Sequence, residues 1–229
     1  MSRQRRVLLV GATGLVGGLA IEEAIGLPDM RLIALSRRIT SLPKGARMEL
    51  LVAGLSGWGE MIAGLQPNSV ICALGTTWAK SGRSEERFRA IDKDLVGAVA
   101  QTARKAGAEN FVLISSVGAN PYSRQFYLRV KGEAEAMLAR LRFHRLDVLR
   151  PGLLRGRREA DRRLLERIGI QASPVTDLFL QGNKRQYRSI DARMVARAAL
   201  QCARSDAGGH FVHDNEGIVR LARRLEQQR

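Results

Sequence analysis

Three polar side chains in the middle of the sequence have the types and spacing needed for carbonyl and alcohol chemistry. Tyr127 and Lys131 are four residues apart, which places them on one face of a helix, and Ser116 precedes them after an apolar run. A tyrosine, whose ordinary pKa is about 10, can donate a proton to a developing alkoxide when a neighbouring ammonium favours its phenolate. A serine hydroxyl can hydrogen-bond the same substrate oxygen. These residues predict a hydride-transfer site, in which a bound cofactor supplies the hydride.

A glycine-rich turn near the amino terminus predicts where that cofactor binds. The apolar residues 7–10 read as a buried strand, and Gly11, Gly14 and Gly17 then lead into a helix-compatible run that ends near residue 27. Gly11 permits a tight turn, Gly14 lets the backbone approach a pyrophosphate, and Gly17 allows the helix to pack closely on the strand. The spacing GxxGxxG is a variant of the dinucleotide-binding pattern, and a turn without a ligand is the structural alternative.

Two arginines after the second expected strand indicate which dinucleotide binds. Residues 31–35 read as this strand, and Ser36, Arg37 and Arg38 follow it. An acidic residue at this position would hydrogen-bond the ribose of NAD, whereas arginine accommodates the 2′-phosphate of NADP. The sequence therefore predicts NADP(H) in preference to NAD(H). The alternative is that both are ordinary surface arginines.

Strands and helices alternate along the rest of the chain, which predicts an α/β fold with a doubly wound parallel sheet, the Rossmann fold. Further strands are expected over 47–52, 69–74, 110–114, 146–150 and 210–212, and helices over 57–65, 85–105, 122–141, 190–204 and 217–228. In the helix over 85–105, the spacing predicts a buried face of Phe88, Ile91, Leu95, Val99 and Thr102. Gly75 and Ser116 each follow a strand, so both are expected at the carboxyl edge of the sheet, where such folds bind ligands.

The whole chain, 1–229, is expected to form one domain. Its segment 154–188 is basic, interrupted by Gly and Pro, and without a clear period, so we interpret it as a small lobe that covers the substrate. The net charge of +16 raises nucleic acid as a partner, but no dense polybasic tail or aromatic interleaving supports it. A small-molecule substrate is expected instead, and the basic lobe suggests an anionic one. Monomer and homodimer both remain open.

Cysteines and histidines suggest neither a metal site nor a disulfide framework. Cys72 and Cys202 are far apart without metal-like spacing, which predicts reduced thiols in a cytoplasmic protein. His210 and His213 lack a further Cys or His nearby, so no metal is expected there. No run of apolar residues is long enough for a membrane span, so no membrane association is expected.

As an ordered set, the motifs GATGLVG, LSRR, CALGTT, FVLISSVGA, FYLRVKGEAEA and VLRPGLL resemble those of the atypical short-chain dehydrogenase/reductases, in particular the Tat-interacting-protein-like NAD(P)-binding oxidoreductases. This resemblance covers about residues 7–154. It implies cofactor contacts from Gly11, Thr13, Gly14, Leu15, Val16, Arg37, Arg38, Leu74 and Gly75. It also implies that Tyr127 transfers the proton, that Lys131 supports it and holds the nicotinamide ribose, and that Ser116 completes the set. Leu154 and Arg162 would close over the nicotinamide end.

One departure from the family pattern concerns the third strand. Many relatives have an acidic residue after it, near the adenine, whereas residues 52–55 offer none.

The sequence therefore predicts an NADP(H)-dependent oxidoreductase that acts on a carbonyl or an alcohol. One alternative is a non-enzymatic NADP(H)-binding redox sensor or regulator, because a fold and a cofactor do not fix a function. A sugar-nucleotide epimerase or dehydratase is another alternative, although the chain is short for that class, whose substrate lobe is a substantial carboxyl-terminal domain.

Overall fold

The computed structural model describes residues 4–39, 41–46, 48–156 and 188–228, and it confirms the doubly wound parallel sheet. Seven strands lie in the order β3-β2-β1-β4-β5-β6-β9, and every pairing in the described part of the chain is parallel. The sheet strands are β1 (Arg5–Val10), β2 (Met30–Ser36), β3 (Glu49–Val52), β4 (Ser69–Cys72), β5 (Asn110–Ile114), β6 (Arg145–Leu149) and β9 (Gly209–His213). The order reverses between β1 and β4, which is where such sheets bind ligands.

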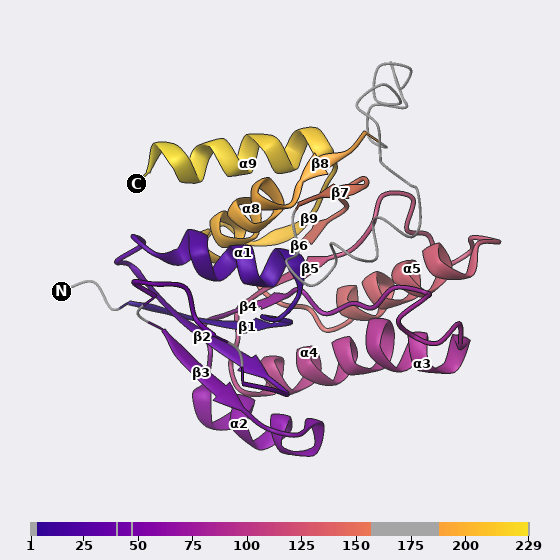
Figure 1. Cartoon of the computed structure of the whole chain (residues 1–229), viewed down its shortest axis with the longest axis horizontal. Coiled ribbons are helices and arrows are strands. Elements are labelled where there is room, and N and C mark those ends of the chain that lie inside the picture. Colours follow the sequence, from indigo (N-terminus) through magenta and orange to yellow (C-terminus); the bar gives the residue numbers. More distant parts are fainter. Residues whose placement is uncertain (1–3, 40, 47, 157–187, 229) are drawn as a thin grey trace.

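Helices cover both faces of the sheet (Figure 1). One face carries α1 (Leu15–Ala24), α8 (Ala192–Arg204) and α9 (Asn215–Gln227), and the other carries α2 (Trp58–Leu65), α3 (Glu85–Arg89), α4 (Val96–Lys105) and α5 (Phe126–Ala139). The central strand β1 is buried on both sides: Val7 and Leu9 join the core under α1 and α8, while Leu8 and Val10 join the core under α2 and α4. This alternation follows from the period of two in a strand.

The helix expected over 85–105 contains a π-helical turn. Between α3 and α4 the chain forms the turn η2 (Ala90–Leu95), which changes the side of the helix that faces the sheet. The predicted buried face was therefore partly wrong: Ile91, Leu95 and Thr102 are only half-buried, and Asp92 and Val96 are buried.

Two other helices begin later than expected. The helix expected from residue 122 begins at Phe126, because Asn120 forms a turn in which its side chain accepts a hydrogen bond from the Tyr122 amide (2.9 Å). The helix expected from residue 190 begins at Ala192, and Asp191 caps it by accepting a hydrogen bond from the Arg193 amide (2.8 Å).

Before this helix, residues Ile190–Asp191 form a short strand, β8, which pairs with β7 (Leu154–Arg155). A short 3₁₀ turn, η1 (Leu55–Gly57), also precedes α2. Most of the expected lobe over 154–188, Arg162 included, lies outside the described residues.

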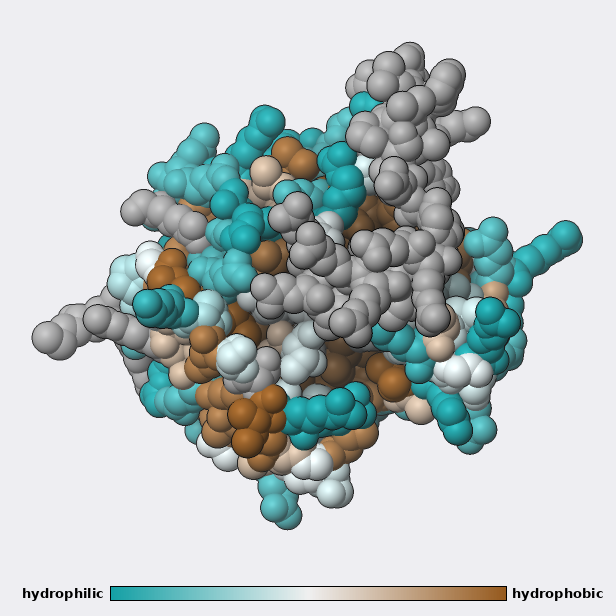
Figure 2. Space-filling view, viewed as in Figure 1, coloured by the Kyte–Doolittle hydropathy of each residue, from teal (hydrophilic) through white to brown (hydrophobic). Residues whose placement is uncertain are grey.

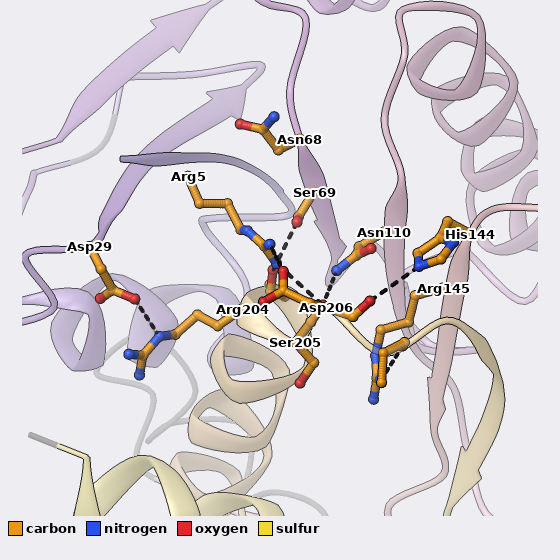
Figure 3. A network of polar contacts seen from close by, with 12 residues as sticks. Arg5, Asp29, Asn68, Ser69, Asn110, His144, Arg145, Arg204, Ser205 and Asp206 are labelled. Atoms are coloured by element: carbon orange, nitrogen blue, oxygen red, sulfur yellow. Dashed lines mark hydrogen bonds and ion pairs between the residues drawn. The ribbon is translucent and has the colours of Figure 1, made fainter. Parts of the chain in front are cut away.

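At the amino edge of the sheet, a polar network hydrogen-bonds the carboxyl end of α8 to the strands (Figure 3). Arg5 of β1 donates to the Ala203 and Ser205 carbonyls (3.0 and 3.2 Å). Ser69 of β4 donates to the Ala203 carbonyl (2.8 Å), and Asn110 of β5 donates to the Ser205 carbonyl (2.7 Å). The first residues of three neighbouring strands thus satisfy carbonyls that the helix end leaves without partners.

A second polar cluster is buried between β6, β9 and α8. Asp147 accepts hydrogen bonds from the Arg145 guanidinium (2.6 and 3.0 Å), and His213 Nε2 lies 2.7 Å from its Oδ1. Burial alone would raise the pKa of Asp147, but the hydrogen bonds from His213 and Arg145 outweigh burial and hold this pKa below its ordinary value.

The ligand atoms of Asp147, Cys202 and His213 lie within 4.8 Å of one another, which is close enough to hold a metal ion. The Arg145 guanidinium already occupies both oxygens of Asp147. Burial also raises the pKa of the Cys202 thiol well above its ordinary value. We therefore interpret the cluster as a buried ion pair that joins three elements.

Replacing Asp147 by asparagine is expected to lower the free energy of unfolding by about 3 kcal/mol at neutral pH, because the buried Arg145 charge loses its partner. The folded-state pKa of Asp147 is depressed, so its ionised form stabilises the protein above the unfolded pKa of about 4. This contribution is lost as the pH falls through the folded-state pKa. Urea unfolding at several pH values should show the wild-type advantage shrinking in acid, and a constant advantage would contradict the assignment.

Candidate active site

The glycine turn after β1 forms a cradle that side chains would fill. Gly11 has φ of +90°, and a Cβ atom there would lie 2.4 Å from the Ala73 carbonyl oxygen. A Cβ atom on Gly17 would lie 2.2 Å from the Gly11 carbonyl oxygen. Gly14 is the N-cap of α1 and offers no capping side chain, so the first amide groups of the helix remain available to an anion. The turn therefore fits a pyrophosphate.

The other turn residues expected to contact the cofactor lie at the start of α1. Thr13 is exposed, Leu15 is half-buried, and the side chain of Val16 is buried in the core, so Val16 can offer only its backbone. The end of β7 also approaches this point, since a Cβ atom on Gly156 would lie 3.0 Å from Leu15 Cδ1. Leu154 is half-buried in the same short strand.

Arg37 and Arg38 follow β2 at the same edge of the sheet, and both are exposed. The Ser36 hydroxyl fixes the turn by donating to the Arg38 carbonyl (2.8 Å). Neither guanidinium forms an ion pair within the described ranges, so both can receive an anion. Beside them, Val52 and Leu55 are 41% and 44% exposed, and Figure 2 shows hydrophobic surface over β3 and α2. This corner therefore offers an apolar surface beside the two arginines.

The two serines after β5 have different surroundings. The Ser115 hydroxyl is buried and donates to Glu135, which also accepts hydrogen bonds from Arg150 Nε (3.1 and 3.2 Å). The half-buried Ser116 hydroxyl donates only a long bond, 3.3 Å, to the Val117 carbonyl. Of the pair, Ser116 is the one whose hydroxyl is available to a substrate.

Lys131 is buried on α5 and forms an ion pair that the sequence analysis missed. Its Nζ atom lies 2.8 Å from Oδ1 of Asp92, and Oδ2 of Asp92 accepts a hydrogen bond from the Thr76 amide (2.8 Å). Asp92 is 1% exposed and lies in the π-helical turn. One sequence signal could have found it, because Asp92 is four residues after the apolar Phe88, where a helix would otherwise bury an apolar side chain.

The charge of Lys131 is set by these neighbours. Burial alone would lower its pKa, but the attraction of the Asp92 carboxylate and, after it, of Tyr127 outweighs burial, so the pKa of Lys131 is raised above its ordinary value. Lys131 is therefore an ammonium at neutral pH. This ammonium lies at the carboxyl edge of the sheet, because a Cβ atom on Gly75 would lie only 3.6 Å from Nζ.

Tyr127 is 39% exposed on α5, where its ring packs against Phe88 with centroids 5.5 Å apart. Register places the glycine turn, Gly75 and Ser116 at one edge, since Val10 pairs with Cys72 and Cys72 pairs with Leu113. The half-buried Leu74 belongs to the same edge. The arrangement thus presents a phenol beside a buried ammonium, next to a cradle for a dinucleotide.

Comparisons with known proteins agree with this geometry. A family model described as NAD(P)H-binding matches residues 11–206. The mitochondrial protein fmp52 of Emericella nidulans is 38% identical over 163 residues, which cover 68% of this chain and 70% of the relative. The mitochondrial protein FMP52 of Candida albicans is 32% identical over 228 residues, which cover 95% and 98%.

Solved structures share the fold. A putative NAD-dependent epimerase/dehydratase from Bacillus halodurans superposes with a TM-score of 0.69 at 23% identity, covering 97% of this chain and 99% of that chain. MoeE5 in complex with UDP-glucuronic acid and NAD has a TM-score of 0.69 at 16% identity, covering 97% and 82%.

Fold and site together define a Rossmann protein that binds a nicotinamide dinucleotide. The chain belongs to the NAD(P)H-binding family, and its FMP52 relatives are atypical short-chain dehydrogenase/reductases, which confirms the resemblance seen in the sequence.

The same comparisons contradict the cytoplasmic location expected from the cysteines, because the relatives are named as mitochondrial proteins. Reduced thiols exclude only oxidising compartments, so they could not distinguish these two locations. Among the described helices, none is long and apolar enough to cross a membrane.

Asp92→Ala is expected to lower the free energy of unfolding by about 3 kcal/mol, because it leaves the Lys131 ammonium buried without a partner. Lys131→Met should have a similar cost, and the double variant should lose less than the sum of the two. Urea unfolding measures all three variants. Asp94→Ala, at an exposed position of the same turn, serves as the control and should change stability by less than about 0.5 kcal/mol. Additive losses would show that the pair does not interact.

Proposed function

We propose that this protein is an NADP(H)-dependent oxidoreductase that interconverts a carbonyl and an alcohol through Ser116, Tyr127 and Lys131. The observation that carries the proposal is the buried Lys131 ammonium, which lies between Asp92 and Tyr127 beneath Gly75. Three segments must meet to build this arrangement, and it lies at the edge where the fold binds its dinucleotide. Stability alone gives no reason to bury a lysine beside an exposed phenol.

The proposed roles follow from the chemistry of each group. A bound dinucleotide would supply the hydride that reduces the carbonyl carbon. Tyr127 would donate its phenolic proton to the carbonyl oxygen. The Lys131 ammonium stabilises the phenolate that remains, and Ser116 donates a hydrogen bond that holds the substrate oxygen. Oxidation of an alcohol uses the same groups in reverse. Asp92 is a positioning residue, because it keeps Lys131 charged and fixed.

The cofactor would be held along the carboxyl edge of the sheet. Gly11, Gly14 and Gly17 form the pyrophosphate cradle, with Thr13, Leu15 and Val16 beside it. Arg37 and Arg38 would bind the 2′-phosphate, which favours NADP(H) over NAD(H). Leu74, Gly75 and Leu154 would line the nicotinamide end, together with Lys131.

Tyr127→Phe is expected to lower kcat/KM for carbonyl reduction by about 100-fold or more, because the proton donor is lost while the ring still packs on Phe88. The Kd for NADPH, measured by calorimetry, should change less than about twofold. Unchanged turnover would remove Tyr127 from the mechanism. A wild-type protein that binds NADPH but reduces no carbonyl would instead favour the non-enzymatic sensor.

The double substitution Arg37→Ala with Arg38→Ala is expected to weaken NADPH binding about tenfold, or about 1.4 kcal/mol, and to leave NADH binding unchanged. Calorimetric titration with each dinucleotide measures both values. Arg31→Ala is the matched control, since it removes an exposed arginine from β2, the strand that Arg37 and Arg38 follow, where it pairs with Glu49. An equal loss for NADPH and NADH would show that the two arginines do not bind the 2′-phosphate.

A further inference from the structure

The loop between β4 and α3 leaves the sheet directly above the buried ion pair and carries an exposed tryptophan. Its first residues are fixed, because Gly75 lies over Lys131 and the Thr76 amide donates to Asp92. Trp78 follows two residues later and is 42% exposed, although an indole has much apolar surface. A large exposed aromatic side chain in a loop that begins at the buried ion pair points to a contact with substrate.

The loop holds the Trp78 backbone in one place. The Trp78 carbonyl accepts hydrogen bonds from the Ser81 hydroxyl (2.8 Å) and from the Arg83 amide (3.0 Å), and the Ser81 amide donates to the Thr77 carbonyl (2.9 Å). Ser81 is only 3% exposed, so these bonds are shielded from water. The backbone that carries the indole is therefore already ordered. A ligand that contacts the indole would lose little binding free energy to ordering this turn.

A chain of aromatic contacts connects Trp78 to Tyr127. The Trp78 ring meets Phe126 edge to face with centroids 5.6 Å apart, and Phe126 meets Phe88 at 5.7 Å. Phe88 then meets the Tyr127 ring at 5.5 Å. Phe88 is fully buried, so the two ends of the chain, Trp78 and Tyr127, are its exposed members. We call these four residues the aromatic shelf.

The positive charges that touch the aromatic shelf have protein partners. The guanidinium of Arg89 lies 5.4 Å from the Phe126 centroid and donates to Glu133 (2.6 Å). The guanidinium of Arg129 lies 5.7 Å from the same centroid and donates to the Ser123 and Arg124 carbonyls (3.0 and 3.3 Å). The four rings meet edge to face or tilted, with interplanar angles of 59–63°, so the shelf offers apolar ring surface chiefly through its exposed ends. The two guanidinium groups beside Phe126 are already hydrogen-bonded within the protein.

We propose that Trp78 determines substrate specificity and that the substrate is an aldehyde or ketone with a planar apolar group, aromatic or conjugated, next to the carbonyl. This inference rests on the proposed function, because it places the reacting carbonyl at Tyr127. The planar group would stack on the exposed ring of Trp78 while the carbonyl oxygen faces the Tyr127 hydroxyl. The basic composition suggests an anionic substrate, whereas the apolar surface beside the site favours this substrate instead.

The kinetic test compares cinnamaldehyde, propanal and glyoxylate as substrates with saturating NADPH. The wild type should have a kcat/KM for cinnamaldehyde at least about tenfold above those for propanal and glyoxylate. Trp78→Ala should raise the KM for cinnamaldehyde about tenfold and change kcat by less than about twofold. In Trp78→Phe, most of this increase in KM should be absent, because an aromatic ring is kept. Ile25→Ala, which trims an exposed apolar side chain at the far end of α1, is the control and should match the wild type. A preference for glyoxylate, or an unchanged KM in Trp78→Ala, would overturn the inference.

A binding measurement separates this inference from the proposed function. Cinnamyl alcohol, which NADPH cannot reduce, is titrated calorimetrically into the protein with and without NADPH. Binding that Trp78→Ala weakens about tenfold supports the aromatic shelf as a ligand surface, even if the wild type reduces no aldehyde and the proposed reaction fails. Absence of binding, or equal binding by the wild type and Trp78→Ala, would overturn the inference whatever the turnover.

Discussion

The ion pair between Lys131 and Asp92 is the interaction on which the site depends. A lysine and an aspartate are costly to bury separately, and the attraction between them offsets part of that cost. Asp92 also accepts the Thr76 amide, so a single carboxylate fixes α5, the π-helical turn and the loop after β4 relative to one another. The position of α5 thus follows from an electrostatic requirement inside the core.

The same constraint accounts for the π-helical turn. A regular helix through residues 85–105 would place Asp92 at a different angle to the sheet, and the extra residue in the turn brings its carboxylate beneath Gly75. π-helical turns often lie at functional sites for this reason. Here the distortion aims one polar side chain inward, while Val96 and Val99 continue the apolar packing on α4.

The sequence was sufficient to predict the sheet, because apolar runs and glycine turns report local structure and parallel connections have one hand. Tyr127 and Lys131 could be placed near the cofactor edge from their spacing and from the strand before them. Asp92 was missed, because its importance depends on a change of helix register and on Lys131, which is distant in sequence. The cluster of Arg145, Asp147 and His213 was missed for a similar reason, since pairing of β6 with β9 brings it together.

The network at the amino edge has a consequence for how the chain reaches this structure. Arg5 contacts Ala203 across a separation of 198 residues, so β1 and α8 can contact each other only after the chain between them has been made. Contacts of such long range slow folding, because the entropy of closing the loop is lost before the contacts form. During synthesis, the nascent sheet therefore exposes the face that α8 will cover until α8 itself has left the ribosome.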